Sequence, residues 1–329
     1  MMPTADLLVL WRVFEHCNLS CHFCGYSKAL RRPRAVADPE RVQAFGKILG
    51  EYARTHGRSA SVSWLGGEPL LWPELPALSH QYRHTFGIGV GVTTNGEPLA
   101  SPAVRTSLVE DYELVTVSVD GVGRFHDAVR NAPGLFDRIK QHVRTLRAEA
   151  DAARSGLVLR VNTILMRGNV AEFESLCREV ASWGVTELTF NQLGGNDRPE
   201  FFPANRLRPE QVERFAAELP RVRAELGRIG LTIHGTDRYL HRLASTANGR
   251  AIPIDDCGPG RSFLFIDEHG RVSPCCFTSS GYGVPVEDIA TPEDLARLPD
   301  TFSRLRRERR ETACEDCHST QVFDKFAAP

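Results

Sequence analysis

The feature that most constrains the fold is an alternation of short apolar runs with longer amphipathic stretches between residues 7 and about 235. The apolar runs predict strands at Leu7–Val13, Ser61–Leu65, Ile88–Thr93, Leu114–Val119, Leu157–Leu165 and Glu187–Asn191. The amphipathic stretches predict helices at Pro39–Tyr52, Pro73–Arg83, Pro102–Glu110, Phe136–Ala150, Val170–Trp183 and Pro209–Arg228. Six repeated β–α units favour a parallel sheet with helices outside it. The predicted fold class is therefore α/β, a partial (β/α)6 TIM-like barrel.

The pattern changes after about residue 235. Phe263–Ile266, a turn at Asp267–Gly270 and Arg271–Ser273 predict a β-hairpin. A segment at Pro292–Leu298 and a charged helix follow. We expect two domains, a barrel over residues 1–235 and a small C-terminal β-hairpin and helix domain over residues 236–329.

Charge and hydropathy exclude some classes of partner. The 40 basic and 41 acidic residues nearly cancel, so no global basic field favours nucleic acid or a membrane surface. The sequence has no charged leader followed by an apolar block, and no apolar run of membrane-spanning length. These features predict a soluble, cytoplasmic protein that binds neither nucleic acid nor membrane.

The chain has nine cysteines, and eight of them fall into two groups. One group is Cys17, Cys21 and Cys24, and the other is Cys257, Cys275, Cys276, Cys314 and Cys317. A reducing cytoplasm disfavours disulfides, so clustered thiols there indicate metal binding. Cys177 stands alone on an apolar helical stripe, which predicts a core position.

The first group has the spacing Cys-x3-Cys-x2-Cys and follows the first predicted strand directly. Three thiolates can bind three irons of a four-iron cluster and leave the fourth iron without a protein ligand. That open iron is what a substrate needs in order to bind the metal directly. A three-ligand zinc site is the alternative.

This motif resembles that of the radical S-adenosylmethionine (SAM) superfamily. The resemblance implies that the open iron chelates the amino and carboxylate groups of SAM, and that Phe23 lies beside the adenine. Gly66-Gly67-Glu68-Pro69, after the second strand, is similar to the family's GGE-P stretch. There the backbone and Glu68 would receive the SAM ammonium, since glycines permit close approach and a carboxylate complements a cation.

Further polar residues end the later strands, where barrel folds place their chemistry. The resemblance implies that Ser118 and Asp120 face the ribose or methionine part of SAM, and that Arg130 pairs with the SAM carboxylate. The other candidate SAM-binding residues are Thr94, Asn95, Asn162 and Asn191. Asx turns, helix caps and surface salt bridges are the alternative roles for residues of these types.

The second group supplies four thiolates from Cys257, Cys275, Cys314 and Cys317, enough for a fully ligated cluster. Zinc bound by four cysteines is the alternative, because spacing does not separate zinc from iron. Downstream of such a barrel, the layout resembles the twitch domain, a shortened SPASM domain, which implies an auxiliary [4Fe–4S] cluster. Cys276 either binds iron in place of Cys275, donates a hydrogen atom, or is an ordinary buried thiol.

The resemblance implies an enzyme that reductively cleaves SAM to a 5′-deoxyadenosyl radical, with flavodoxin or ferredoxin as an electron donor. We expect hydrogen abstraction from a small molecule, a sugar, aminocyclitol or nucleoside, with oxidation of a secondary alcohol in antibiotic or other natural-product biosynthesis. A sugar-acid decarboxylase and a peptide or protein maturase are the alternatives. The sequence assigns no catalytic base or hydrogen donor.

Overall fold

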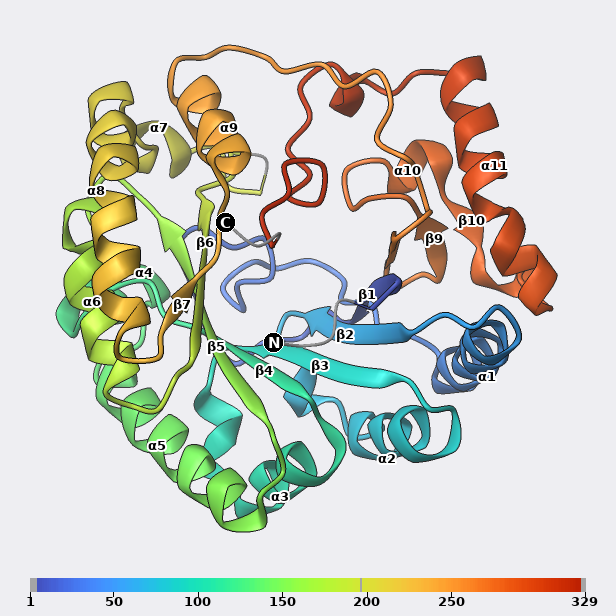
Figure 1. Cartoon of the computed structure of the whole chain (residues 1–329), viewed down its shortest axis with the longest axis horizontal. Coiled ribbons are helices and arrows are strands. Elements are labelled where there is room, and N and C mark those ends of the chain that lie inside the picture. The colour runs from blue at the N-terminus through green and yellow to red at the C-terminus, as the bar shows by residue number, and fades with distance from the viewer. Residues whose placement is uncertain (1–4, 196, 327–329) are drawn as a thin grey trace.

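The computed structural model describes residues 5–195 and 197–326. Its strands are β1 (Leu7–Phe14), β2 (Ala60–Gly66), β3 (Gly89–Thr94), β4 (Leu114–Ser118), β5 (Val158–Leu165), β6 (Glu187–Gln192), β7 (Thr232–Ile233), β8 (Phe263–Ile266), β9 (Arg271–Ser273) and β10 (Val284–Pro285). Within the described residues these strands form one sheet in the order β10-β9-β8-β1-β2-β3-β4-β5-β6-β7. The pairs from β8 through β1 to β7 are parallel, and only those of β9 are antiparallel. The sheet is curved and open, which confirms the partial barrel (Figure 1).

Helices cover the outer side of the curved sheet (Figure 1). The helices of the described residues are α1 (Pro39–Thr55), α2 (Leu75–His80), α3 (Pro102–Asp111), α4 (Arg124–Arg130), α5 (Leu135–Ala153), α6 (Phe173–Ala181), α7 (Phe202–Asn205), α8 (Pro209–Gly227), α9 (Asp237–Ala247), α10 (Ser279–Tyr282) and α11 (Pro292–Glu308). Short turns of other helix types are η1 (Pro69–Leu71), η2 (Gln81–Thr85), η3 (Glu97–Ala100), η4 (Val170–Glu172), η5 (Val286–Asp288) and η6 (Thr312–Cys314). None of the helices described is long and apolar enough to cross a membrane.

The two faces of the barrel strands differ in burial. Along β1 and β5, buried residues alternate with partly exposed ones. Val9 and Trp11 pack in the core, whereas Arg12 on the opposite face of β1 remains partly exposed. Since successive side chains in a strand point to opposite faces, the inner wall of the barrel is accessible to solvent.

The six predicted barrel strands are confirmed, with ends that differ by a few residues at most. The elements that escaped prediction include β7, β10, α4, α7, α9 and α10. The segment at Pro292–Leu298 and the charged helix after it form one helix, α11, which runs through Pro299.

The predicted C-terminal hairpin does not stand apart from the barrel sheet. Its first strand, β8, pairs in parallel with β1, in a register that includes Leu8↔Phe263 and Trp11↔Ile266. The second hairpin strand, β9, and then β10 extend the same sheet. The division into domains at residue 235 stays a prediction.

Candidate active site

The first cysteine group lies in the loop that follows β1, at the carboxyl end of the parallel strands. The backbone N–H groups of Leu19 and Tyr26 donate to Cys17 Sγ at 3.4 Å and to Cys24 Sγ at 3.3 Å. Burial, together with the neighbouring Cys24 and Cys17 thiols, raises the pKa of Cys21 to about 12. The three thiols are therefore close enough to repel one another as thiolates.

This donor set fits an iron–sulfur cluster. Buried thiolates that repel each other need a cation between them, and sulfur ligands favour iron or zinc. Asn95, in the loop after β3, supports the site. Its Nδ2 donates to Asn18 Oδ1 at 2.7 Å and lies 3.8 Å from Cys17 Sγ. Such amide donors stabilise thiolate ligands by hydrogen bonding to the charged form.

The loop after β2 passes directly against the cysteine loop. Gly67 N donates to Phe14 O at 2.6 Å, and Glu68 N donates to His16 O at 2.9 Å. A Cβ on Gly66 would lie 2.1 Å from Phe14 O, and one on Gly67 would lie 2.3 Å from His16 O. Only glycine permits this approach, so these two residues hold the loops in contact.

Replacing Gly67 with alanine will destabilise the protein by about 1–3 kcal/mol, because the new methyl group overlaps backbone atoms that have little freedom to move. Urea unfolding of the two purified proteins measures this difference. Gly227→Ala is the matched control, since nothing lies within 4 Å of a Cβ at Gly227. Equal stability of the two variants would contradict the close approach.

Glu68 is fully buried and joins the loops after β2 and β3. Its carboxylate accepts hydrogen bonds from Thr94 Oγ1 at 2.8 Å, from Asn95 N at 2.6 Å and from Leu70 N at 3.2 Å. Burial raises the pKa of Glu68 to about 7, although these hydrogen bonds oppose the rise. An ionised carboxylate has about four acceptor positions, so three donors leave one for a cationic ligand.

The variant Glu68→Gln will bind SAM about 10- to 100-fold more weakly, the range expected for losing a hydrogen bond to a charged group. Iron content will stay unchanged, because Glu68 is not a cluster ligand in this account. Anaerobic calorimetry with SAM measures the affinity, and Glu74→Gln, at an exposed glutamate, is the control. Unchanged affinity in Glu68→Gln would remove this residue from the SAM site.

Asp120 and Arg130 form a buried ion pair after β4. Arg130 Nε donates to Asp120 Oδ2 at 2.8 Å, and Ile164 N donates to Asp120 Oδ1 at 2.9 Å. The guanidinium lies over the Phe23 ring, 5.7 Å from its centroid. Arg130 also opposes the rise that burial causes in the pKa of Cys21. The structure thus brings Phe23, Asp120 and Arg130 together with the cysteine loop, with Asp120 already paired to protein donors.

The remaining polar candidates lie along β4, β5 and β6 and meet the end of the chain. Ser118 pairs in register with Asn162, and Asn191 Nδ2 donates to Asn162 Oδ1 at 3.1 Å. Asn191 Oδ1 accepts from Lys325 Nζ at 2.8 Å and from Tyr239 OH at 3.2 Å. Among the described contacts, Asn162 and Asn191 therefore join the C-terminal segment rather than the cysteine loop.

Lys325 is buried, and the dark red end of the chain to which it belongs lies within the curve of the sheet (Figure 1). Burial lowers its pKa well below the ordinary value, and Arg160 adds to this effect. The folded protein therefore holds this proton less tightly than the unfolded chain does. Stability should rise as pH increases from the lowered pKa toward about 10.4, the ordinary lysine value.

The variant Lys325→Met will lack this rise of stability with pH, because methionine has no proton to lose. Urea unfolding at several values between about pH 7 and about pH 10 measures the slope of the free energy of unfolding against pH. Lys28→Met, at an exposed lysine, should keep the wild-type slope. An identical slope in Lys325→Met would show that the buried ammonium does not titrate as stated.

Sequence reasoning missed the residues that hold the loops in place. Asn169 Nδ2 donates to Asp120 O at 2.6 Å and to Ile164 O at 2.8 Å. His126 Nδ1 accepts from Asp120 N at 3.1 Å. Single polar residues such as Asn169, in a loop, and His126, on α4, carry no periodic signal, and their partners lie up to 49 positions away.

Four of the five cysteines of the second group line one cavity of about 90 Å³. The cysteines on its wall are Cys257, Cys275, Cys314 and Cys317. Burial raises the pKa of Cys317 to about 11, and the other three add to this rise. Four converging soft donors fit a fully ligated cluster, as predicted, and zinc has the same ligand preference.

Cys276 is not on the wall of that cavity. Cys276 is exposed, and the charged groups that act on its thiol electrostatically include Arg12, on the inner face of β1, and Asp197. Of the two adjacent cysteines, Cys275 is thus the one that meets the other three.

These features define a radical SAM enzyme. The family model of the radical SAM superfamily matches residues 11–180, so the chain belongs to that superfamily. Its cofactors are SAM and a [4Fe–4S] cluster, and its cysteine-rich C-terminal region is of the twitch or SPASM type, whose members carry auxiliary clusters.

Individual relatives are similar to this chain over most of its length. Mycofactocin maturase MftC of Mycobacterium tuberculosis is 24% identical over 318 residues, which cover 95% of this chain and 76% of that protein. GTP 3′,8-cyclase of Chlorobaculum tepidum is 28% identical over 250 residues, 73% of this chain and 68% of the cyclase. The crystal structure of Streptococcus suis SuiB bound to SAM covers 97% of this chain and 72% of SuiB, with 15% identity and a TM-score of 0.67. SuiB has also been crystallised with the precursor peptide SuiA.

Proposed function

We propose that this protein is a peptide maturase that removes a hydrogen atom from a carbon of a peptide substrate. The observation that carries this proposal is the extent of the similarity to MftC. It covers 95% of the chain and so extends well beyond the barrel, whereas the similarity to GTP 3′,8-cyclase covers 73%. The comparison supports a peptide substrate better than the predicted sugar, aminocyclitol or nucleoside.

The residues around the first cysteine group have separate tasks in this proposal. When bound and reduced, the cluster held by Cys17, Cys21 and Cys24 supplies the electron that cleaves SAM to methionine and a 5′-deoxyadenosyl radical. Glu68 receives the SAM ammonium, and Arg130 pairs with its carboxylate while remaining held by Asp120. We also infer that flavodoxin or ferredoxin delivers the electron.

The second cysteine group lies beside the carboxyl end of the barrel in this arrangement. His318, next to Cys317, is within 3.2 Å of Gln192 Nε2 at the end of β6. The ring of Phe277, a partly exposed residue on the cysteine cavity, lies 6.3 Å from the His318 ring. A substrate bound at the barrel rim would therefore lie between the two cysteine groups, which supports an auxiliary role for the second.

The test is an anaerobic turnover assay with reconstituted enzyme, SAM and a strong reductant. One series receives short peptides encoded beside the gene, and the other receives pooled aminocyclitols, sugar nucleotides and GTP. Peptide-dependent 5′-deoxyadenosine together with a changed peptide mass, such as the loss of two hydrogens, supports the proposal.

The two series separate the alternatives directly. If only the small molecules stimulate SAM cleavage and change mass, the peptide proposal fails. Loss of two hydrogens from an alcohol would then restore the dehydrogenase, and loss of carbon dioxide would indicate the decarboxylase. The variant Cys17→Ala should be inactive in both series and controls for abiotic SAM breakdown.

A further inference from the structure

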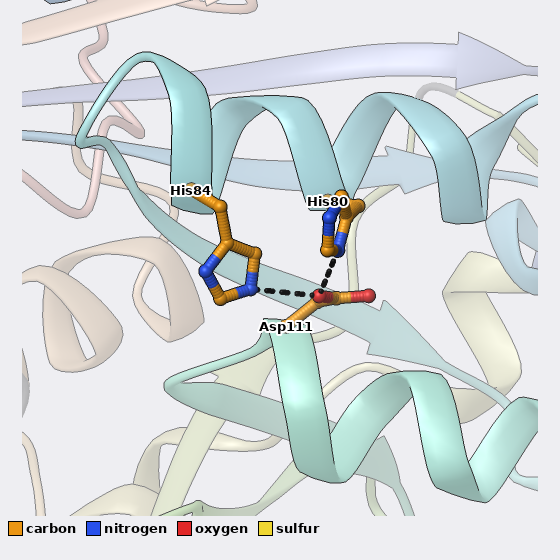
Figure 2. Close-up of side chains that lie close together, drawn as sticks. All are labelled: His80, His84 and Asp111. Atoms are coloured by element: carbon orange, nitrogen blue, oxygen red, sulfur yellow. Dashed lines mark hydrogen bonds and ion pairs between the residues drawn. The ribbon is translucent and has the colours of Figure 1, made fainter.

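Three potential metal ligands meet on the outer side of the barrel. In the sequence they lie between the two cysteine groups and belong to neither. His80 ends α2, His84 lies in the π-helical turn η2 that continues it, and Asp111 is the last residue of α3 (Figure 2). Asp111 Oδ1 lies 2.9 Å from His80 Nδ1 and 3.1 Å from His84 Nε2. All three ligand atoms lie within 4.8 Å of one another.

The change of helix type brings the two imidazoles together. In a regular α-helix, residues four apart are offset by about 40° around the axis. The wider turn of η2 reduces that offset, and π-helical insertions of this kind are common at functional sites. The His80 and His84 rings consequently lie side by side, with centroids 4.5 Å apart and planes tilted by 42°.

Asp111 is placed where its negative charge is unfavourable without a cation. Its side chain is 6% exposed, and it lies at the C-terminal end of α3, the negative end of the helix dipole. Among the described residues, its hydrogen-bond partners are His80, His84 and Ser107, with no lysine or arginine. A divalent cation would compensate this charge.

The two separations from Asp111 Oδ1 are ordinary hydrogen-bond lengths, and they also lie close to those of a metal site. Zinc binds imidazole nitrogen and carboxylate oxygen at about 2.0–2.2 Å, so neighbouring ligand atoms in a tetrahedral site lie about 3.3–3.5 Å apart. The two observed separations from Asp111 Oδ1 are a few tenths of an ångström shorter. The imidazoles are 63% and 48% exposed, which leaves them free to rotate by that amount.

Buried contacts hold the backbone on both sides of this cluster. Ser79, next to His80, hydrogen-bonds with the hydroxyl of Tyr112, next to Asp111, at 2.7 Å. Trp64 Nε1 donates to the same serine oxygen at 3.0 Å. Ser107 Oγ donates to the second oxygen of Asp111 at 3.3 Å, an arrangement that orients carboxylate ligands in metal sites. The ligands are thus pre-positioned by the fold.

We propose that His80, His84 and Asp111 form a binding site for one divalent cation of the zinc class, distinct from the iron sites. Two imidazoles and one carboxylate are a common zinc donor set, with a fourth position left for water. The bound cation would join α2 and η2 to α3 on the outer wall of the barrel. This inference does not depend on the proposed substrate.

The test measures zinc on the anaerobically reconstituted holoenzyme, so that iron already occupies the cysteine groups. After incubation with zinc chloride and gel filtration, elemental analysis gives zinc and iron per chain. We expect one zinc per chain in the wild type and in His241→Ala, which changes an exposed histidine outside the cluster. His84→Ala and Asp111→Asn should lose this zinc. Their affinity for zinc should fall by more than the roughly 10- to 100-fold that is typical when a residue behind a metal ligand is changed.

Thermal unfolding gives an independent readout that does not use enzyme activity. Zinc at about 100-fold above its dissociation constant should raise the melting temperature of the wild type by about 4 °C. His84→Ala removes an exposed side chain, so it should fold normally and show no such rise. Equal zinc content and equal thermal shifts in the wild type and His84→Ala would overturn the proposal.

Discussion

Replacing Cys17, Cys21 and Cys24 together with alanine will abolish SAM cleavage and remove about half of the iron. These three thiols converge in one loop and would hold one cluster. The four cysteines of the second group that could hold the other cluster line a separate cavity. Each four-iron cluster contributes about four irons, so about four should remain on the triple variant. Iron analysis and chromatography of 5′-deoxyadenosine measure the two effects.

The matched control for this triple variant is Cys177→Ala. Cys177 is fully buried on α6, in the hydrophobic core, as the sequence predicted. Its loss should leave both the iron content and SAM cleavage at wild-type levels. SAM cleavage by the triple variant above the enzyme-free background would contradict the assignment of the first cysteine group.

Replacing Cys314 and Cys317 with alanine will also lower the iron content by about half, but SAM cleavage will persist. The first cysteine group is intact in this variant, so SAM still binds and is cleaved. Product formation should be lost, because the cavity beside the barrel rim loses two of its four thiol donors. Iron analysis, 5′-deoxyadenosine and product mass separate these three effects.

Cys276→Ala is the control for the second group, since Cys276 is not on the wall of that cavity. It should keep the wild-type iron content, whereas Cys275→Ala should lower it. If Cys276→Ala loses the iron instead, the choice between the adjacent cysteines is reversed. If the purified protein holds zinc there and remains active, the auxiliary cluster is excluded.

The barrel was predictable because its elements are long and strongly patterned. β5 alternates buried and partly exposed residues over eight positions, and α5 presents one apolar face. β7 has only two residues, too few for a period to show. The pairing of β8 with β1 joins residues about 255 positions apart, and no local pattern encodes it.

The candidate site was predictable wherever a short motif carries the chemistry. The cysteine spacing and the Gly-Gly-Glu-Pro stretch gave residues that the structure brings together at one rim. Lys325 and Asn169 gave no such signal, since they act through tertiary contacts with Asn191 and Asp120. The sequence indicated the substrate class least well, because those motifs serve SAM binding rather than substrate binding.

The measurement that tests the central claim most directly is electron paramagnetic resonance of the reduced, reconstituted protein with and without SAM. We expect a [4Fe–4S] signal that SAM perturbs in the wild type and in the Cys314/Cys317 double variant. The Cys17/Cys21/Cys24 variant should show only the second cluster, unaffected by SAM. A wild-type spectrum that SAM leaves unchanged, or one that lacks a second cluster, would contradict a two-cluster radical SAM enzyme.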